Sequence, residues 1–288
     1  MQDFALSDSQ ADDFERDGFI TVDRIISDEE VALLRERYDE LFKGQFETGL
    51  VPDEVNWLQG RDPADHTRQI CNGWKSDRYL AGVILQESIG RACAKLGRWM
   101  GTRISQDNVL WKPPGGKPLG FHQDSSYEQW TTKPDWVSCW IALDRTTREN
   151  GCLQLVRGSH LIGRIDPAPL TPTQNEADPA RMRRILARHE LFYAEMQPGD
   201  ALFFHCNTLH RSDANRSKDR RWTLLICYDA ARNDALKRED DRSYVRLDKV
   251  ADAALEQAGL KFAAGDDAEH FTSRPYVPDV AGGARKAS

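Results

Sequence analysis

The sequence lacks several features that would assign a class of protein at once. No apolar run in its 288 residues approaches the roughly 20 residues that a membrane-spanning helix needs. The acidic amino terminus has no hydrophobic segment typical of a secretory signal. None of the six cysteines belongs to a C-x-x-C pair, so a zinc ribbon or thioredoxin motif is not expected. The net charge of -7 gives no support to a nucleic-acid partner.

What is present is typical of a globular protein with a sizeable core, since 40% of the residues are hydrophobic and 30% are charged. The cysteines fall within apolar runs, as Cys139 does in the segment 137–140. We therefore expect reduced, buried thiols and a reducing compartment. The hypothesis is a cytoplasmic protein with neither a membrane nor a nucleic-acid partner.

The periodicity of the apolar residues predicts a single domain over 1–288, with a mainly helical flank at 1–101, a barrel at 102–230 and a C-terminal extension at 231–288. We expect helices at 7–17, from a capping box that begins at Ser27, at 77–100, at 179–187 and at 251–261. The segment 44–75 lacks clear periodicity, and we interpret it as a long loop that could form a lid. The chain from Arg285 onward is expected to be disordered.

From residue 102 the pattern changes to short apolar strands separated by Gly, Pro, Asn and Asp. Strands at this spacing indicate an all-β sandwich or barrel, with the preceding helices packed outside it. The expected strands are 104–111, a strand around 122, 136–143, 152–156, 201–204 and 222–228.

The segment Phe121-His122-Gln123-Asp124 carries the strongest chemical signal. Alternate side chains of a strand point to one face, so His122 and Asp124 could form two-thirds of a metal site. His210, which follows the apolar strand 201–204, is the candidate third ligand. Two histidines and one carboxylate leave three coordination positions open, as in the non-haem Fe(II) oxygenases.

Arg221 lies just beyond His210, at the start of the apolar strand 222–226. A dicarboxylate bound to the metal at one end needs a cation for the other end. The planar guanidinium makes bidentate bonds to a carboxylate and stays charged. The alternative is a surface arginine beside Arg220.

Several short motifs occur in a characteristic order between about 108 and 228. They are Lys112-Pro113-Pro114, 121–124, 139–144, Glu149-Asn150-Gly151-Cys152-Leu153, Gly158-Ser159-His160, Gly199-Asp200-Ala201, and His210-Arg211-Ser212 with Asn215 and Arg221. With these motifs the sequence resembles the phytanoyl-CoA dioxygenase family of Fe(II)- and 2-oxoglutarate-dependent oxygenases. The resemblance implies a mainly β fold, a double-stranded β-helix (a jelly-roll, cupin-like barrel) with flanking N-terminal helices and iron at its open end.

By this resemblance His122, Asp124 and His210 are the iron ligands. Arg221 holds the distal carboxylate of 2-oxoglutarate, and Ser212 adds a hydroxyl to it. Trp140 and Asn108 also match positions beside the co-substrate, although core packing would explain them too. The sequence departs from the family pattern at Arg157 and at Arg211, and neither change removes a ligand. We expect His66 at the surface and His160 and His205 in structural hydrogen bonds.

The implied activity is a dioxygenase reaction that consumes 2-oxoglutarate and O2 and releases succinate and CO2. A carboxylate at Asp124 favours hydroxylation or another oxidation over halogenation. Tyr127, Trp130, Phe121 and Arg211 are candidates for the substrate side, and the absence of a basic cluster for a CoA phosphate favours a small metabolite or natural-product intermediate. Two alternatives remain: a cupin-like metalloenzyme that does not use 2-oxoglutarate, and a non-catalytic family member that acts as a binding module.

Overall fold

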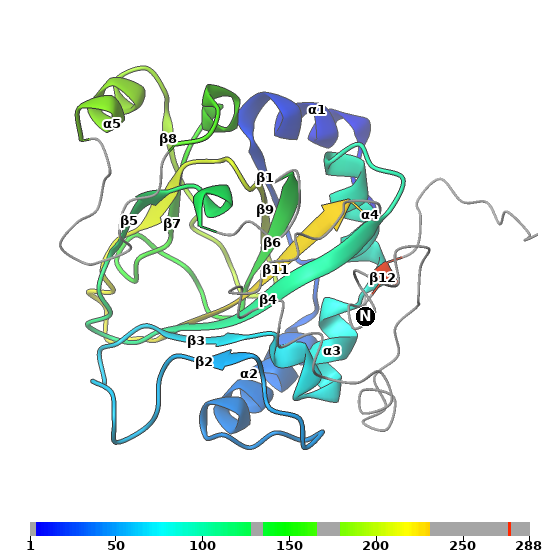
Figure 1. The fold of residues 1–288 in the computed structure, drawn as a ribbon, viewed down its shortest axis with the longest axis vertical. Coiled ribbons are helices and arrows are strands. Elements are labelled where there is room, and N and C mark those ends of the chain that lie inside the picture. Colours follow the sequence, from blue (N-terminus) through cyan, green and yellow to red (C-terminus); the bar gives the residue numbers. More distant parts are fainter. Residues whose placement is uncertain (1–3, 128–134, 166–178, 231–275, 278–288) are drawn as a thin grey trace, which may run out of the picture.

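The computed structural model describes residues 4–127, 135–165, 179–230 and 276–277 (Figure 1). The helix expected at 251–261, the tail from Arg285 and the substrate candidate Trp130 lie outside these residues.

Within the described residues the strands form an eight-stranded sheet and a four-stranded sheet. The larger sheet has the order β1 (Phe19–Val22), β9 (Ala201–His205), β6 (Trp136–Ala142), β11 (Arg221–Ala230), β4 (Thr102–Lys112), β3 (Arg68–Cys71) and β2 (Glu54–Val55), with β12 (Tyr276–Val277) paired to β4. The smaller sheet has the order β5 (Leu119–His122), β10 (His210–Ser212), β7 (Leu153–Val156) and β8 (Leu191–Tyr193). All of these pairings are antiparallel, and the arrangement agrees with the expected jelly-roll barrel.

Strand β6 shows why the larger sheet has a core on each face. All seven of its residues are buried, so alternate side chains enter different cores. Trp140 and Ala142 point into the barrel, where they pack with apolar residues of β7 and β9. Cys139 and Ile141 point outward into the core that the helices cover. The inward face of the same sheet carries the functional side chains described below.

The helices are α1 (Asp8–Asp17), α2 (Asp28–Phe42), α3 (Arg78–Ile84), α4 (Glu87–Leu96) and α5 (Pro179–Leu186), with 3-10 turns η1 (Gly73–Lys75), η2 (Asp124–Ser126) and η3 (Ser159–Ile162). Capping boxes at Ser7 and Ser27 begin α1 and α2. Gly18 ends α1 in the left-handed region at φ +82°. The first four helices pack against the outer face of the larger sheet, and α5 lies beside the smaller one (Figure 1).

Three local predictions need correction. The helix expected at 77–100 is two helices, because the extended backbone at Gln86 separates α3 from α4. Met100, expected in its buried stripe, is 54% exposed. The segment 44–75 is not a structureless loop, since β2 and β3 form a hairpin that adds to β4. Short edge strands of this kind show no apolar periodicity in the sequence, so the pattern did not predict the hairpin.

The six cysteines are all free and buried, as expected. None of the described helices combines the length and apolar character that crossing a membrane requires.

Candidate metal centre and its pocket

Two histidines face each other across the smaller sheet. His122 ends β5, His210 begins β10, and the two are direct cross-strand partners. Each Nδ1 lies 2.9 Å from a backbone carbonyl oxygen, that of Gly120 for His122 and that of Thr208 for His210. A carbonyl oxygen only accepts, so Nδ1 carries the proton in both rings. In the neutral form of each ring Nε2 then keeps a free lone pair, which is the form that binds a metal.

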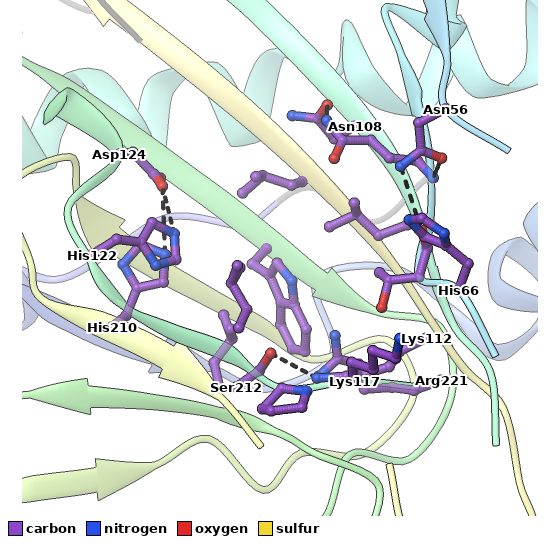
Figure 2. Close-up of a pocket in the computed structure, with 18 of the residues that line it drawn as sticks. Asn56, His66, Asn108, Lys112, Lys117, His122, Asp124, His210, Ser212 and Arg221 are labelled. Carbon is purple, nitrogen blue, oxygen red and sulfur yellow. Dashed lines mark hydrogen bonds and ion pairs between the residues drawn. The ribbon is translucent and has the colours of Figure 1, made fainter. Parts of the chain in front are cut away.

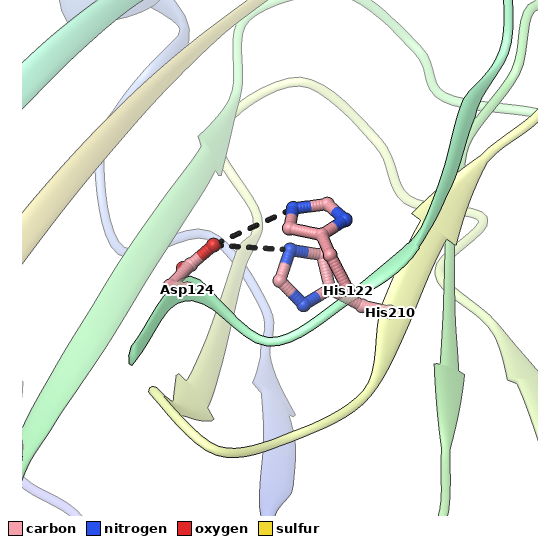
Figure 3. A group of neighbouring side chains, drawn as sticks. All are labelled: His122, Asp124 and His210. Atoms are coloured by element: carbon pink, nitrogen blue, oxygen red, sulfur yellow. Dashed lines mark ion pairs between the residues drawn. The ribbon is translucent and has the colours of Figure 1, made fainter. Parts of the chain in front are cut away.

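Asp124 completes the group (Figure 3). Its Oδ1 lies 3.6 Å from Nε2 of His122 and 3.5 Å from Nε2 of His210. Its Oδ2 is buried and has no hydrogen-bond partner in the part of the chain that the structure describes. The expectation that both residues of the H-x-D motif lie on one strand is wrong, because the strand ends at His122 and Asp124 begins the turn η2. The side chain of Gln123 fixes this turn through bonds to backbone atoms of Gly163, Ile165 and Asn207.

The electrostatics of the three residues suit a cation. Burial disfavours the charged carboxylate of Asp124, but the imidazoles of His210 and His122 outweigh this effect and hold its pKa below the ordinary value. Burial, and then the neighbouring His122, lowers the pKa of His210 to about 4. At neutral pH the group offers a neutral His210 imidazole and a carboxylate. A buried carboxylate oxygen without a partner beside two free Nε2 atoms fits a divalent iron ion.

The group opens into a cavity of about 720 Å³ with three functional ends (Figure 2). The metal group forms the first end. A second end carries Ser212, Lys112, Lys117 and Arg221, and a third carries Asn108 with the hairpin residues Asn56 and His66.

Arg221 begins β11 and is buried at the cation end of the cavity. Its Nη1 donates to the carbonyl oxygen of Gly151, while its Nε is buried and has no partner among the residues that the structure describes. Its guanidinium carbon lies 5.5 Å from the centre of the Trp140 ring, which also lines the cavity. Burial lowers its pKa to about 10, so it remains charged at neutral pH. A buried cation with a free donor suits an anionic ligand.

Lys112 is a second basic residue at this end, to which the sequence interpretation gave no function. It ends β4 as the cross-strand partner of Arg221, and its Nζ donates to Oγ of Ser212 at 2.8 Å and to the carbonyl of Asp213. Burial, and then the charge of Arg221, lowers the pKa of Lys112 to about 6. The signal in the sequence was the Lys-Pro-Pro motif at the end of a predicted strand.

The structure places the remaining predicted co-substrate and substrate residues that it describes in two ways. Trp140, Ser212, Asn108 and Tyr127 line the cavity, and the ring of Tyr127 packs edge-on against His122 at 6.0 Å between centroids. Phe121 and Arg211 do not belong to it.

The exclusion of Phe121 and Arg211 follows from strand alternation, because each is adjacent to an inward-facing histidine. Phe121 packs in the apolar cluster beneath α5, and Arg211 lies over its ring at 4.7 Å and binds Gln154. The expectation that they face the substrate cavity is therefore wrong.

Hairpin β2–β3 contributes residues that the sequence interpretation missed, namely Asn56 and Gln69. His66 is exposed, as expected, and lies at the cavity wall. His160 and His205, expected to be structural, bond respectively to the Glu15 carbonyl and to the amide of Asn207. The hairpin could have been recognised only by knowing that β4 has a free edge.

The fold and the site together define a non-haem metal oxygenase of the jelly-roll class, with an open coordination face beside an anion pocket. The sequence model of the phytanoyl-CoA dioxygenase (PhyH) family matches residues 14–223. The chain belongs to this family, and with it to the non-haem iron dioxygenases that use 2-oxoglutarate.

Relatives support the same assignment. The methylphosphonate hydroxylase of Gimesia maris is 26% identical over 283 residues, which cover 94% of this chain and 97% of the relative. The ectoine dioxygenase of Halomonas elongata is 29% identical over 252 residues, covering 80% and 72%. The crystal structure of EctD from S. alaskensis with 2-oxoglutarate and 5-hydroxyectoine superimposes with a TM-score of 0.67 at 23% identity, covering 81% of this chain and 79% of EctD. This last likeness concerns the fold.

Proposed function

We propose that His122, Asp124 and His210 hold Fe(II), and that Arg221 and Lys112 hold the far carboxylate of 2-oxoglutarate. A small metabolite or natural-product intermediate then occupies the rest of the cavity and is oxidised at an unactivated C–H bond. The proposal is supported by the placement of all five side chains around one cavity.

The three proposed metal ligands contribute to the reaction by holding the ion in place. When bound, iron and 2-oxoglutarate supply the activation of O2 and the oxidation of the substrate, with succinate and CO2 as the other products. The bonds from Nδ1 to the carbonyls of Gly120 and Thr208 hold both rings with Nε2 toward the ion. Because the three ligands bind the ion from one side, its other coordination positions stay open for the co-substrate and O2. No side chain needs to serve as a general base.

The single observation that carries the assignment of the co-substrate is the pair Arg221 and Lys112. Arg221 and Lys112 are both buried and are direct cross-strand partners, and Nε of Arg221 has no partner among the described residues. Burial and the charge of Arg221 disfavour the charged form of Lys112, so a carboxylate between them would favour the charged lysine and would satisfy the unpaired donor of Arg221. Ser212, which accepts from Lys112, can donate its own proton to the same carboxylate.

Trp140 is proposed to flank the co-substrate, since its ring lines the cavity beneath the guanidinium of Arg221. Its buried ring also excludes water from this end, which strengthens the charged hydrogen bonds formed there. Tyr127, beside His122, is proposed to contact the substrate.

The size of the cavity and the names of the relatives support a small substrate. About 720 Å³ must hold both the co-substrate and the substrate, and the relatives above are named for methylphosphonate and ectoine. The six free, buried cysteines support a reducing compartment such as the cytoplasm.

The test is the formation of succinate from 2-oxoglutarate with Fe(II) and ascorbate, compared between the wild type, Arg221→Met and Arg220→Met. Arg220 is the matched control because it is the exposed neighbour of Arg221, paired with Asp144. We expect Arg221→Met to raise the KM for 2-oxoglutarate by about 30-fold or more, since loss of one partner of a buried charged contact costs about 2–5 kcal/mol. Unchanged succinate formation in Arg221→Met would show that Arg221 does not hold the far carboxylate, whereas no succinate formation by the wild type would favour a metalloenzyme that does not use 2-oxoglutarate.

A further inference from the structure

The third end of the cavity is built from carboxamides. Gln69 on β3 and Asn108 on β4 both line the cavity, and Nε2 of Gln69 donates to Oδ1 of Asn108 at 2.7 Å. Figure 2 shows Asn108 apart from both Asp124 and Arg221, on the side that Asn56 and His66 also border. If the proposed function holds, the metal and the cation end are taken up by iron and 2-oxoglutarate, so this end faces the substrate, and Asn108 belongs to the substrate side and not to the co-substrate beside which the resemblance placed it.

The orientation of the Asn108 amide is fixed by its neighbours. Its Oδ1 accepts from Nε2 of Gln69, from Nε2 of Gln106 at 3.0 Å and from Sγ of Cys71 at 3.0 Å. In this arrangement the amides of Gln69 and Gln106 and the thiol of Cys71 all donate to the oxygen of Asn108, and the other terminal atom of Asn108 is the amide nitrogen. Among the described residues, Nδ2 of Asn108 and Oε1 of Gln69 have no hydrogen-bond partner. The wall thus offers a free donor and a free acceptor on adjacent side chains.

The charge of this end differs from that of the cation end. Gln69, Gln106, Asn108 and Asn56 carry no formal charge, and the exposed Glu54 reaches Sγ of Cys71 at 3.9 Å. Asp65 and His66 also line the cavity, from the loop of the hairpin. A charged group placed against the carboxamides would lose its water without gaining a counter-charge from them, which is unfavourable. A neutral group with an acceptor beside a donor would satisfy both free atoms of the wall.

We propose that Gln69 and Asn108 recognise the substrate, and that the substrate is a compact neutral molecule presenting a carbonyl and an N–H on one edge, as a lactam does. The N–H of such an edge donates to Oε1 of Gln69, and its carbonyl accepts from Nδ2 of Asn108. The backbone of Gln69 is held separately, since its N–H donates to Oδ1 of Asn56 at 2.7 Å and its carbonyl accepts from the N–H of Asn56 at 3.1 Å. Replacing the side chain therefore leaves the hairpin pairing in place.

The experiment measures binding to the full-length protein loaded with Zn(II), which supports no turnover, and with 2-oxoglutarate. Ligand-observed NMR compares three five-membered rings: the neutral lactam 2-pyrrolidinone, the cation of pyrrolidine and the anion cyclopentanecarboxylate. We expect the lactam to bind about tenfold more tightly than either charged ring, and Gln69→Leu to remove about this factor while the affinity for 2-oxoglutarate is unchanged. Gln69→Glu should turn the preference toward the cation, and Gln197→Leu, at an exposed glutamine outside the cavity, should change nothing.

A lactam that binds no better than the charged rings overturns this proposal. So does a Gln69→Leu protein that keeps its affinity for the lactam, or one that loses 2-oxoglutarate together with the lactam, because either result assigns Gln69 to the scaffold. Failure of the proposed function is seen separately, as the absence of succinate formation by the wild type. Succinate formation without a preference for the lactam rejects only the inference about the substrate.

Discussion

His122 and His210 are direct partners across strands β5 and β10, with their ring centroids 4.2 Å apart. Both rings are tied at Nδ1 to the carbonyl oxygen of the residue two positions earlier, so both direct Nε2 toward Oδ1 of Asp124 (Figure 3). The sheet register therefore prepares the ligand geometry before an ion binds, which reduces the ordering that binding requires.

Asp124→Asn tests the metal centre. Removal of the carboxylate charge from between two imidazoles should weaken Fe(II) binding by at least the roughly 10–100-fold that loss of a ligand-supporting contact costs. Asp135→Asn is the control, because Asp135 is an exposed carboxylate 3.3 Å from Nε2 of another histidine, His205.

Anaerobic equilibrium dialysis gives the affinity for Fe(II), and thermal unfolding with and without the ion gives an independent measure. An ion at about 100 times its Kd should stabilise the wild type by about 2.7 kcal/mol and Asp124→Asn by much less. Equal stabilisation of both proteins would place the metal elsewhere.

Lys112 should make the binding of 2-oxoglutarate dependent on pH. Its pKa of about 6 in the ligand-free pocket leaves it neutral at pH 7.5, and a bound carboxylate favours the charged form. Binding then takes up a proton, so the affinity should fall as pH rises above about 6, by up to about tenfold per unit. Arg221, with a pKa of about 10, stays charged over the same range and adds no dependence.

Calorimetric titration in buffers of different ionisation enthalpy measures this proton uptake between pH 6.5 and 8.5. Lys112→Met should bind 2-oxoglutarate more weakly and without proton uptake. Uptake that persists in Lys112→Met would assign the proton to another group.

Gly151→Ala should damage the fold and the anion pocket together. Gly151 has φ +76°, and a Cβ there would collide with the carbonyl oxygen of Asp213, which accepts from Lys112. The carbonyl of Gly151 itself accepts from Arg221. Left-handed strain and the collision should together lower the free energy of unfolding by about 2–4 kcal/mol.

Gly49→Ala is the matched control, since Gly49 also has φ +76° but no atom of the described residues lies within 4 Å of its Cβ position. It should lower the free energy of unfolding by only about 1–2 kcal/mol and leave the KM for 2-oxoglutarate unchanged. Urea denaturation and steady-state kinetics measure both effects, and equal losses in the two variants would contradict the account.

Arg68→Ala should loosen the hairpin β2–β3 that borders the cavity. The guanidinium carbon of Arg68 lies 3.6 Å from the ring centre of Trp57 and 3.7 Å from that of Trp111, so it joins the hairpin loop to β4. Loss of both contacts should lower the free energy of unfolding by about 1–3 kcal/mol and accelerate amide hydrogen exchange across 54–71. Arg61→Ala, at an exposed residue paired with its neighbour Asp62, should leave exchange in this segment unchanged.

The sequence by itself determined the chemical types at the site and most of the elements that carry them. Capping boxes at Ser7 and Ser27 and the apolar strands around β6 and β11 are encoded within a few consecutive residues, so local patterns predict them. The motifs also predicted the two histidines, one carboxylate and one arginine that the fold brings around a single cavity.

The tertiary structure decided which side chains share a space. Asp124 sits in a turn rather than on the strand, Lys112 stands beside Arg221, and Phe121 faces away from the cavity. These placements depend on where strands end and on the register between segments far apart in the chain. The carboxamide wall at Gln69 and Asn108 has the same origin, because it forms where β3 pairs with β4 at a free sheet edge.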